Sequence, residues 1–101
     1  MKGRISLDGH QFANEHEYKR YLGIRELTRT GRLSRFEVKP SFPLIVNEVL
    51  VDTYTPTFKF LDPAKNEERI IQVMVSGIKN PLLELRIKLF EALYGFHIER
   101  W

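Results

Sequence analysis

Cysteine is absent from this chain of 101 residues, so neither a disulfide bond nor a thiolate metal site can support its fold. Long hydrophobic runs are absent too, and no apolar stretch approaches the roughly 20 residues that cross a membrane as a helix. The first residues, Met1 to Ile5, lack the apolar run of a signal peptide. These absences predict a protein of the reducing cytoplasm that has no membrane partner.

What is present describes an ordinary folded chain. Hydrophobic residues make up 43% and charged residues 29% of the sequence, a balance that favours a folded domain over a disordered segment. A chain of this length is large enough for one hydrophobic core and too small for two. We therefore expect a single domain over residues 1–101.

Basic residues are concentrated in one segment. The net charge is +3, and seven lysines and arginines lie from Lys19 to Lys39, where the acids are Glu26 and Glu37. Such a cluster attracts phosphate backbones. The alternative is a solvated helix face followed by a charged turn.

Turn residues and apolar periodicity divide the chain into helices and strands. The first helix begins after Asn14, which can cap it, and ends at Gly31; the second begins at Asn80-Pro81 and ends at Gly95. Extended segments are expected at 5–7, 33–38, 42–46, 49–60, 69–76 and 96–101. This order predicts an α/β fold in which two helices flank a mixed sheet.

Two charged residues fall on apolar helix faces. Glu17 follows Asn14 at the spacing of a capping box, and it lies within the apolar arc of the first helix. Arg86 lies within the apolar arc of the second helix, where it either contacts phosphate across a cleft or extends outward over its neighbours. The expected core face of that helix comprises Leu82, Leu85, Leu89, Phe90 and Leu93.

The order of three segments carries a family resemblance. Glu17 on a helix, then Tyr54-Thr55-Pro56-Thr57-Phe58, then Val73-Met74-Val75-Ser76-Gly77, resembles the PD-(D/E)XK restriction-endonuclease-like superfamily. Within that superfamily the chain is most similar to a phage- and prophage-associated family of small proteins of unknown function. The likeness extends to Ile5-Ser6-Leu7-Asp8-Gly9 before Phe12, Arg20-Tyr21, Gly31, Phe42-Pro43-Leu44, Leu89-Phe90 and Tyr94-Gly95. It implies a restriction-endonuclease-like fold with a central mixed β-sheet, in the host cytoplasm if the chain is phage-encoded.

Active members of the superfamily cleave nucleic acid with bound metal. Acids from two strands, and often a helix glutamate, hold Mg²⁺, which activates water and stabilises charge on the phosphate. A lysine two residues after the second acid points to the same side of its strand. The resemblance places these motif positions at Glu17, Thr57, Met74 and Ser76, where Glu17 alone keeps a suitable group. It therefore implies a degenerate site without a metal, and Mg²⁺ as cofactor only if the site is active.

Neighbouring acids do not replace the missing ones. Asp52 and Asp62 are each five residues from Thr57, and this odd offset places them on the opposite strand face unless a bulge intervenes. Glu68 lies about 20 Å from Met74 along an extended strand. Metal-dependent cleavage is therefore not expected.

Three functions remain open. The first is binding of nucleic acid, above all DNA, by a catalytically silent domain, and the residues expected to contact it are Lys19, Arg20, Arg25, Arg29, Arg32, Arg35, Lys59 and Arg86. The second is a protein–protein module (an inhibitor, regulator or assembly subunit) that binds a protein partner or a second copy, because Met74 suits an apolar contact. The third is an active endonuclease whose acids come from other positions. For Glu17 a helix cap, and for Lys59 an exposed strand lysine, are the structural alternatives.

Overall fold

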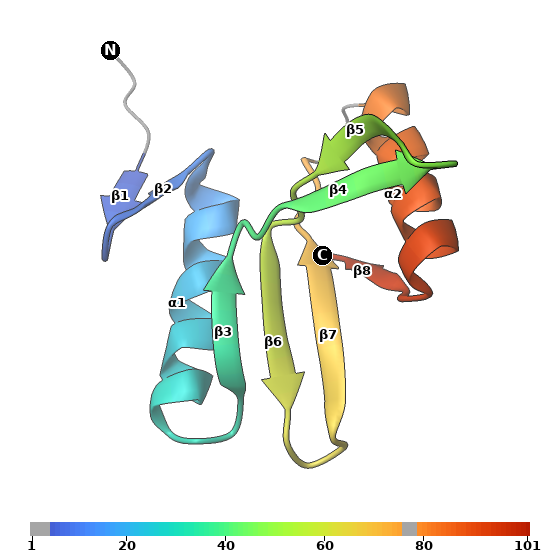
Figure 1. Ribbon diagram of the computed structural model, residues 1–101. Helices are drawn as coiled ribbons and strands as arrows, with labels where there is room; N and C mark the ends of the chain where they lie inside the picture. The colour runs from blue at the N-terminus through green and yellow to red at the C-terminus, as the bar shows by residue number, and fades with distance from the viewer. Residues whose placement is uncertain (1–4, 76–78) are drawn as a thin grey trace.

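A computed structural model describes residues 5–75 and 79–101 of the chain (Figure 1). Its elements are, in order, β1 (Ile5–Leu7), β2 (His10–Phe12), α1 (Glu15–Arg29), β3 (Ser34–Val38), β4 (Phe42–Val46), β5 (Val49–Tyr54), β6 (Phe58–Asp62), β7 (Glu67–Gln72), α2 (Pro81–Tyr94) and β8 (Ile98–Arg100). In this part of the chain neither helix is long and apolar enough to cross a bilayer.

The largest sheet is mixed, as predicted. Its strands lie in the order β3-β6-β7-β8, with antiparallel pairing except between β7 and β8, which run parallel. Two hairpins, β1–β2 and β4–β5, form separate two-stranded sheets. The first hairpin turns at Asp8-Gly9, and its Asp8 carboxylate fastens it to α1 by accepting hydrogen bonds from Tyr21 Oη and Arg25 Nη1.

The two helices cover opposite faces of this sheet. Ile71 of β7 packs in a buried cluster with the α1 residues Tyr21 and Ile24, whereas its neighbour Ile70 packs in a second cluster with Ile87 of α2. Consecutive strand residues point to opposite faces, so the two clusters lie on the two sides of β7. The predicted α/β class with a mixed sheet and two flanking helices is confirmed at this level.

Both helix starts match the sequence signals. Asn14 Oδ1 accepts a hydrogen bond from Glu17 N at 2.8 Å, and Asn80 Oδ1 accepts one from Leu83 N at 3.1 Å, ahead of Pro81 in the first turn. At the end of α2, Gly95 adopts the left-handed conformation with φ 77°, which a residue without a Cβ reaches at little cost.

The extended segments differ from the prediction in four places, of which one is the last strand: predicted for 96–101, it is the shorter β8, Ile98–Arg100. Residues 49–60 do not form one strand, because Pro56, which lacks an N–H for a ladder bond, separates β5 from β6. The short strand β2 was not predicted. The strand predicted for 69–76 is shorter at its end, since β7 stops at Gln72; Ser76 lies outside the described residues.

The predicted core face of α2 is wrong in part. Ile87 and Phe90 are its buried residues, whereas Leu82, Leu85 and Leu93 are 42–61% exposed. Leucines occupy more than one side of this helix, so periodicity alone does not say which side meets the sheet. Phe90 was correctly predicted, and Leu89 is half-buried.

Candidate functional site

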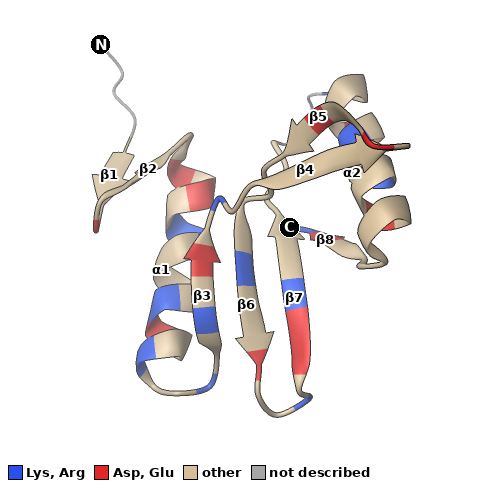
Figure 2. Cartoon of the chain, in the orientation of Figure 1, with Lys and Arg blue, Asp and Glu red and all other residues tan. Residues whose placement is uncertain are grey.

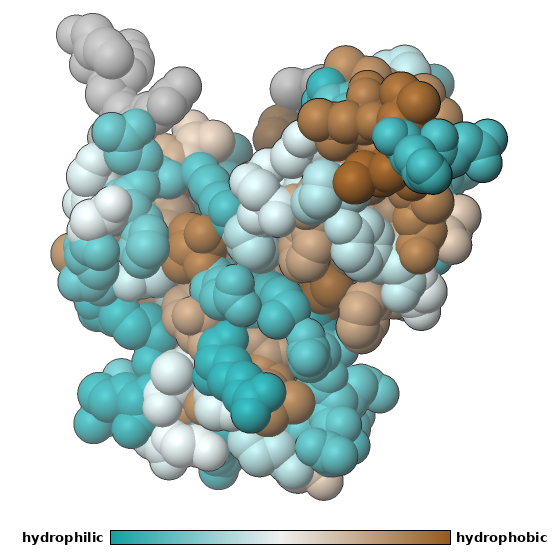
Figure 3. Space-filling view, in the orientation of Figure 1, coloured by the Kyte–Doolittle hydropathy of each residue, from teal (hydrophilic) through white to brown (hydrophobic). Residues whose placement is uncertain are grey.

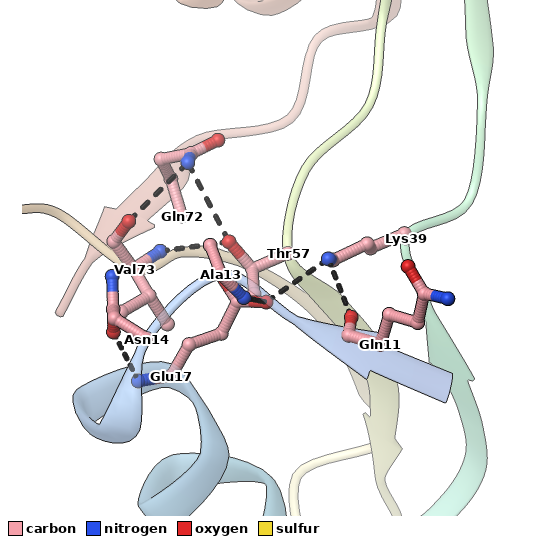
Figure 4. Close-up of polar contacts among 8 residues, drawn as sticks. All are labelled: Gln11, Ala13, Asn14, Glu17, Lys39, Thr57, Gln72 and Val73. Atoms are coloured by element: carbon pink, nitrogen blue, oxygen red, sulfur yellow. Dashed lines mark hydrogen bonds and ion pairs between the residues drawn. The ribbon is translucent and has the colours of Figure 1, made fainter. Parts of the chain in front are cut away.

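The first turns of the two helices border a small cavity of about 240 Å³, at the end of β7. Its lining includes Glu17 from α1, Gln72 and Met74 from the end of β7 and the segment after it, and Leu83 from α2. Thr57 lies beside it, in contact with Gln72 and Val73 (Figure 4). We call this region the motif pocket, because it gathers the three described motif positions: Glu17, Thr57 and Met74.

Glu17 is neutralised by a lysine from a distant segment. Its side chain is 10% exposed, and its Oε1 lies 3.1 Å from Lys39 Nζ, which also donates a 2.8 Å hydrogen bond to the Gln11 carbonyl (Figure 4). The same Oε1 accepts a 3.4 Å hydrogen bond from Ala13 N, one residue ahead of the cap. Glu17 therefore accepts a hydrogen bond from the residue before the cap, where a capping box would use the cap residue itself, and it also forms an ion pair.

Thr57 acts as a buried polar cross-link. Only 4% of the residue is exposed, and its Oγ1 accepts hydrogen bonds from Val73 N at 3.0 Å and Gln72 Nε2 at 3.5 Å. The Gln72 amide oxygen in turn accepts a 2.7 Å bond from Tyr54 Oη. Burial raises the pKa of the Tyr54 phenol. This network satisfies the backbone where β7 ends, a task that a short hydroxyl side chain can perform in a closed space.

Met74 contributes sulfur and methylene groups where the resemblance expects an acid. Its backbone N donates a 2.7 Å bond to the Trp101 carbonyl, so the segment after β7 continues beside the end of β8. With Val75 and His16 its half-buried side chain lines a hollow of about 410 Å³. An apolar hollow of this kind suits a hydrophobic contact rather than a phosphate or a cation.

The donor set of the motif pocket does not fit a divalent metal. Mg²⁺ is held by carboxylates, phosphates and water in octahedral geometry. Here the one carboxylate is paired with a lysine ammonium, and the neighbouring donors are an amide and a hydroxyl that are engaged with each other. In residues 5–75 and 79–101 no three Asp, Glu, His or Cys side chains gather as a metal site would require. Asp52 pairs with Arg86 at 2.7 Å and Glu68 with Lys59 at 2.9 Å, away from the pocket.

Most of the residues predicted to contact nucleic acid have partners within the chain. Ion pairs join Lys19 to Glu15, Arg25 to Asp8, Arg29 to Glu26, Lys59 to Glu37 and Glu68, and Arg86 to Asp52. The guanidinium of Arg20 lies 5.1 Å from the centre of the Trp101 ring. Arg32 and Arg35 are exposed and have no ion pair with any described residue.

These two arginines lie at the opposite end of the sheet from the motif pocket. Arg32 lines a surface hollow together with Asp62 and Pro63, at the far end of β6 from Thr57. Lys65, in the turn between β6 and β7, is a further exposed cation at this end without an ion pair in the described chain (Figure 2). We call Arg32, Arg35 and Lys65 the cationic end; the acids Asp62 and Glu67 lie at the same end of the sheet (Figure 2).

Two features were not found from the sequence. The Glu17–Lys39 pair joins residues 22 positions apart, so no local signal announces it. Lys65 was not among the residues expected to contact nucleic acid, and it lies in the turn between β6 and β7, at the same end of the sheet as Arg32 (Figure 2). The sequence showed the cluster of basic residues, but it did not show which of these cations form ion pairs.

Comparison with known proteins adds no further constraint. No family profile, curated protein or solved structure matches the chain. The nuclease-like family is therefore a resemblance that rests on the motifs and on their order.

Proposed function

We propose that this chain is a nuclease-like domain without metal-dependent cleavage that binds the phosphate backbone of nucleic acid. The observation that carries the proposal is the cationic end, where Arg32, Arg35 and Lys65 are exposed and lack an ionic partner within the described chain. Unpaired arginine and lysine side chains are the groups that replace condensed counterions on a phosphate backbone.

Two paired cations of α1 offer further phosphate contacts: Arg29 at the end of the helix, near the cationic end, and Lys19 near its start, toward the motif pocket. Lys19 and Arg29 form ion pairs in which all four side chains are 60–75% exposed. Exposed pairs of this kind contribute little free energy, so a phosphate can replace the glutamate at small cost. The chain's net charge of +3 also attracts a negatively charged phosphate backbone.

The motif pocket supports the part of the proposal that excludes metal-dependent cleavage. In a working site the helix glutamate and two strand acids face a metal. Here Glu17 faces Lys39, the Thr57 hydroxyl is occupied by Val73 N and Gln72, and Met74 has no metal-binding oxygen in its side chain. The mixed sheet with one helix on each face agrees with the proposed restriction-endonuclease-like ancestry.

A gel-shift titration tests the binding. Linear and branched DNA duplexes are titrated with protein at low and at moderate salt, and we expect retention that weakens as salt rises. The variant Arg32→Gln/Arg35→Asn/Lys65→Gln should bind several-fold more weakly, and the salt slope should fall by about 0.9 for each phosphate that the variant no longer neutralises. Asparagine is chosen for position 35 because Arg35 has φ 52°, a conformation that asparagine tolerates.

The matched control is Lys88→Gln. Lys88 is an exposed lysine of α2, whereas the cationic end lies at the start of β3 and in the β6–β7 turn. Lys88 has no ion pair in the described residues. Its loss removes one charge, and it should leave the salt slope unchanged. Absence of retention at low salt would reject the proposal.

A second candidate function is a protein-interaction module. The observation that favours it is a group of exposed aliphatic side chains on the β4–β5 hairpin and α2, far more apolar than a nucleic-acid surface. Exposed apolar side chains that gather in this way are typical of a surface that binds protein.

A further inference from the structure

Six aliphatic side chains are exposed around the β4–β5 hairpin and on the helix α2 beside it. They are Ile45, Val49, Leu50, Val51, Leu82 and Leu85, and each is 48–61% exposed. Two of them, Ile45 and Leu50, pair across the hairpin and point away from α2, because Leu44, the neighbour of Ile45 in β4, is buried against that helix. Figure 3 shows hydrophobic side chains gathered over β5 and the start of α2. We call these six residues the apolar face.

One ion pair links its two parts. Arg86 of α2, the neighbour of Leu85, donates a 2.7 Å hydrogen bond to Asp52, the neighbour of Val51 in β5. The pair brings the leucines of the helix beside the valines of the strand. The charges of Arg86 and Asp52 cancel each other, so this ion pair favours neither an acidic nor a basic partner.

The leucines of the face carry a sequence signal for burial. Leu82 and Leu85 recur with Leu89 and Leu93 at the spacing of one helix stripe, which is why the sequence predicts a core face there. The chain's own sheet covers a different side, centred on Ile87 and Phe90. Leu89 packs against the core, whereas Leu82 and Leu85 are left uncovered by the chain, as is typical of a contact surface.

β5 supplies an open strand edge beside this stripe. It pairs with β4 on one side, and no strand of the described chain pairs with its other edge. The run Val49-Leu50-Val51 contains no lysine, proline or glycine, the residues that guard exposed edges, whereas β4 carries Pro43. An edge of this composition is a template for a further strand.

We infer that a second copy of this chain covers the apolar face, with β5 of one protomer antiparallel to β5 of the other across a two-fold axis. A two-fold contact uses the same patch on both partners, so an aliphatic edge strand and an aliphatic stripe are matched by their own copies. Homodimer interfaces are also the more apolar class. The six side chains expose on the order of 600 Å², divided between the two faces of the hairpin, against about 800 Å² that each partner contributes to a standard interface.

The first test is the mass in solution. Light scattering after size exclusion should give twice the chain mass of 12.0 kDa over a hundredfold range of protein concentration. The dimer should persist at high salt, because it is held by apolar contact rather than by charge. The variant Leu50→Glu/Leu85→Glu should be a monomer with an unchanged circular dichroism spectrum, since both side chains are exposed in the single chain.

Leu27→Glu is the matched control. Leu27 is a 39% exposed leucine of α1 outside the apolar face, and its substitution should leave the dimer intact. A wild-type monomer at every concentration overturns the inference, and so does a monomer that captures a different protein. A dimer that the double variant does not dissociate overturns the assignment to this face.

A second test does not depend on the folding of the charged variant. The chain contains no cysteine, so a single introduced cysteine reports one position. Under mild oxidation Val49→Cys, Leu50→Cys or Val51→Cys should give a disulfide-linked dimer, because residues near a two-fold axis lie opposite their own copies. Leu27→Cys should not. Absence of cross-linking at all three β5 positions contradicts strand pairing. Both tests are independent of DNA, so failure of the nucleic-acid proposal leaves them standing.

Discussion

Lys39 Nζ lies 3.1 Å from Glu17 Oε1 and ties the start of α1 to the segment that follows β3. The lysine adopts φ 52°, and its backbone N donates a 2.9 Å bond to the Thr57 carbonyl. One residue therefore neutralises the carboxylate of the motif pocket and fixes the backbone at Thr57. The Glu17–Lys39 pair therefore gives the motif pocket a structural role: it joins α1 to the segment after β3.

Removal of the lysine should destabilise the fold. Lys39→Met leaves the mostly buried Glu17 carboxylate without its cation, and we expect the free energy of unfolding to fall by about 1–2 kcal/mol, between the values for exposed and buried pairs. Urea unfolding measures it. Glu17→Gln/Lys39→Met should recover part of the loss, because an amide needs no counter-charge. Equal stability of Lys39→Met and wild type would contradict a structural role for the pair.

Release of Glu17 should not create a nuclease. Supercoiled plasmid incubated with Mg²⁺ or Mn²⁺ should stay intact with the wild type and with Lys39→Met, because one carboxylate leaves most of the charge of a divalent ion unbalanced. Agarose gels read the result. Glu17→Ala is the control for contamination: nicking by the wild type that disappears in this variant would establish an active site with rearranged acids.

The Thr57 hydroxyl should be worth more than its methyl group. Thr57→Val keeps the shape of the side chain and removes the acceptor for the buried Val73 N–H, so stability should fall by about 1–3 kcal/mol. Thr57→Ser keeps the acceptor and should cost less, since it loses a single methyl group. Chemical denaturation of the two variants side by side gives the comparison. A larger loss for serine than for valine would show that packing, rather than the hydrogen bond, fixes this position.

Short-range signals account for what the sequence predicted well. Helix caps such as Asn14 and Asn80 act on residues three positions away, and the left-handed Gly95 acts at its own position, so local sequence is sufficient for them. The mixed sheet and its two flanking helices follow from the alternation of such elements.

Long-range contacts account for the rest. Whether the leucines of α2 are covered depends on where the sheet and the β4–β5 hairpin pack, and periodicity fits more than one side of a leucine-rich helix. The partner of Lys39 lies on another element and gives no sequence signal. The motif positions were placed by resemblance, and the structure brings Glu17, Thr57 and Met74 into one region without supplying the acids that cleavage needs.

The junction of β7 and β8 should respond to acid. Arg69 donates two hydrogen bonds to the Glu99 carboxylate, from Nε at 2.7 Å and from Nη2 at 2.6 Å, and thereby joins these parallel strands. This guanidinium holds the pKa of Glu99 below its ordinary value. Because the pKa is lower in the folded state, the stabilisation is present above the unfolded pKa of about 4.3 and is lost as the pH falls through the folded pKa.

Arg69→Met should therefore lower stability at neutral pH and flatten its decline toward acid, because Glu99 then titrates close to its unfolded value. Arg69→Lys keeps the charge and loses the two-point geometry, so it should fall between the two proteins. Urea unfolding at pH values from 7 down to 3 measures all three curves. Parallel curves for wild type and Arg69→Met would mean that the Arg69–Glu99 pair adds no pH dependence to the junction of β7 and β8, and that its contribution there comes from the packing of the Arg69 side chain over Phe60.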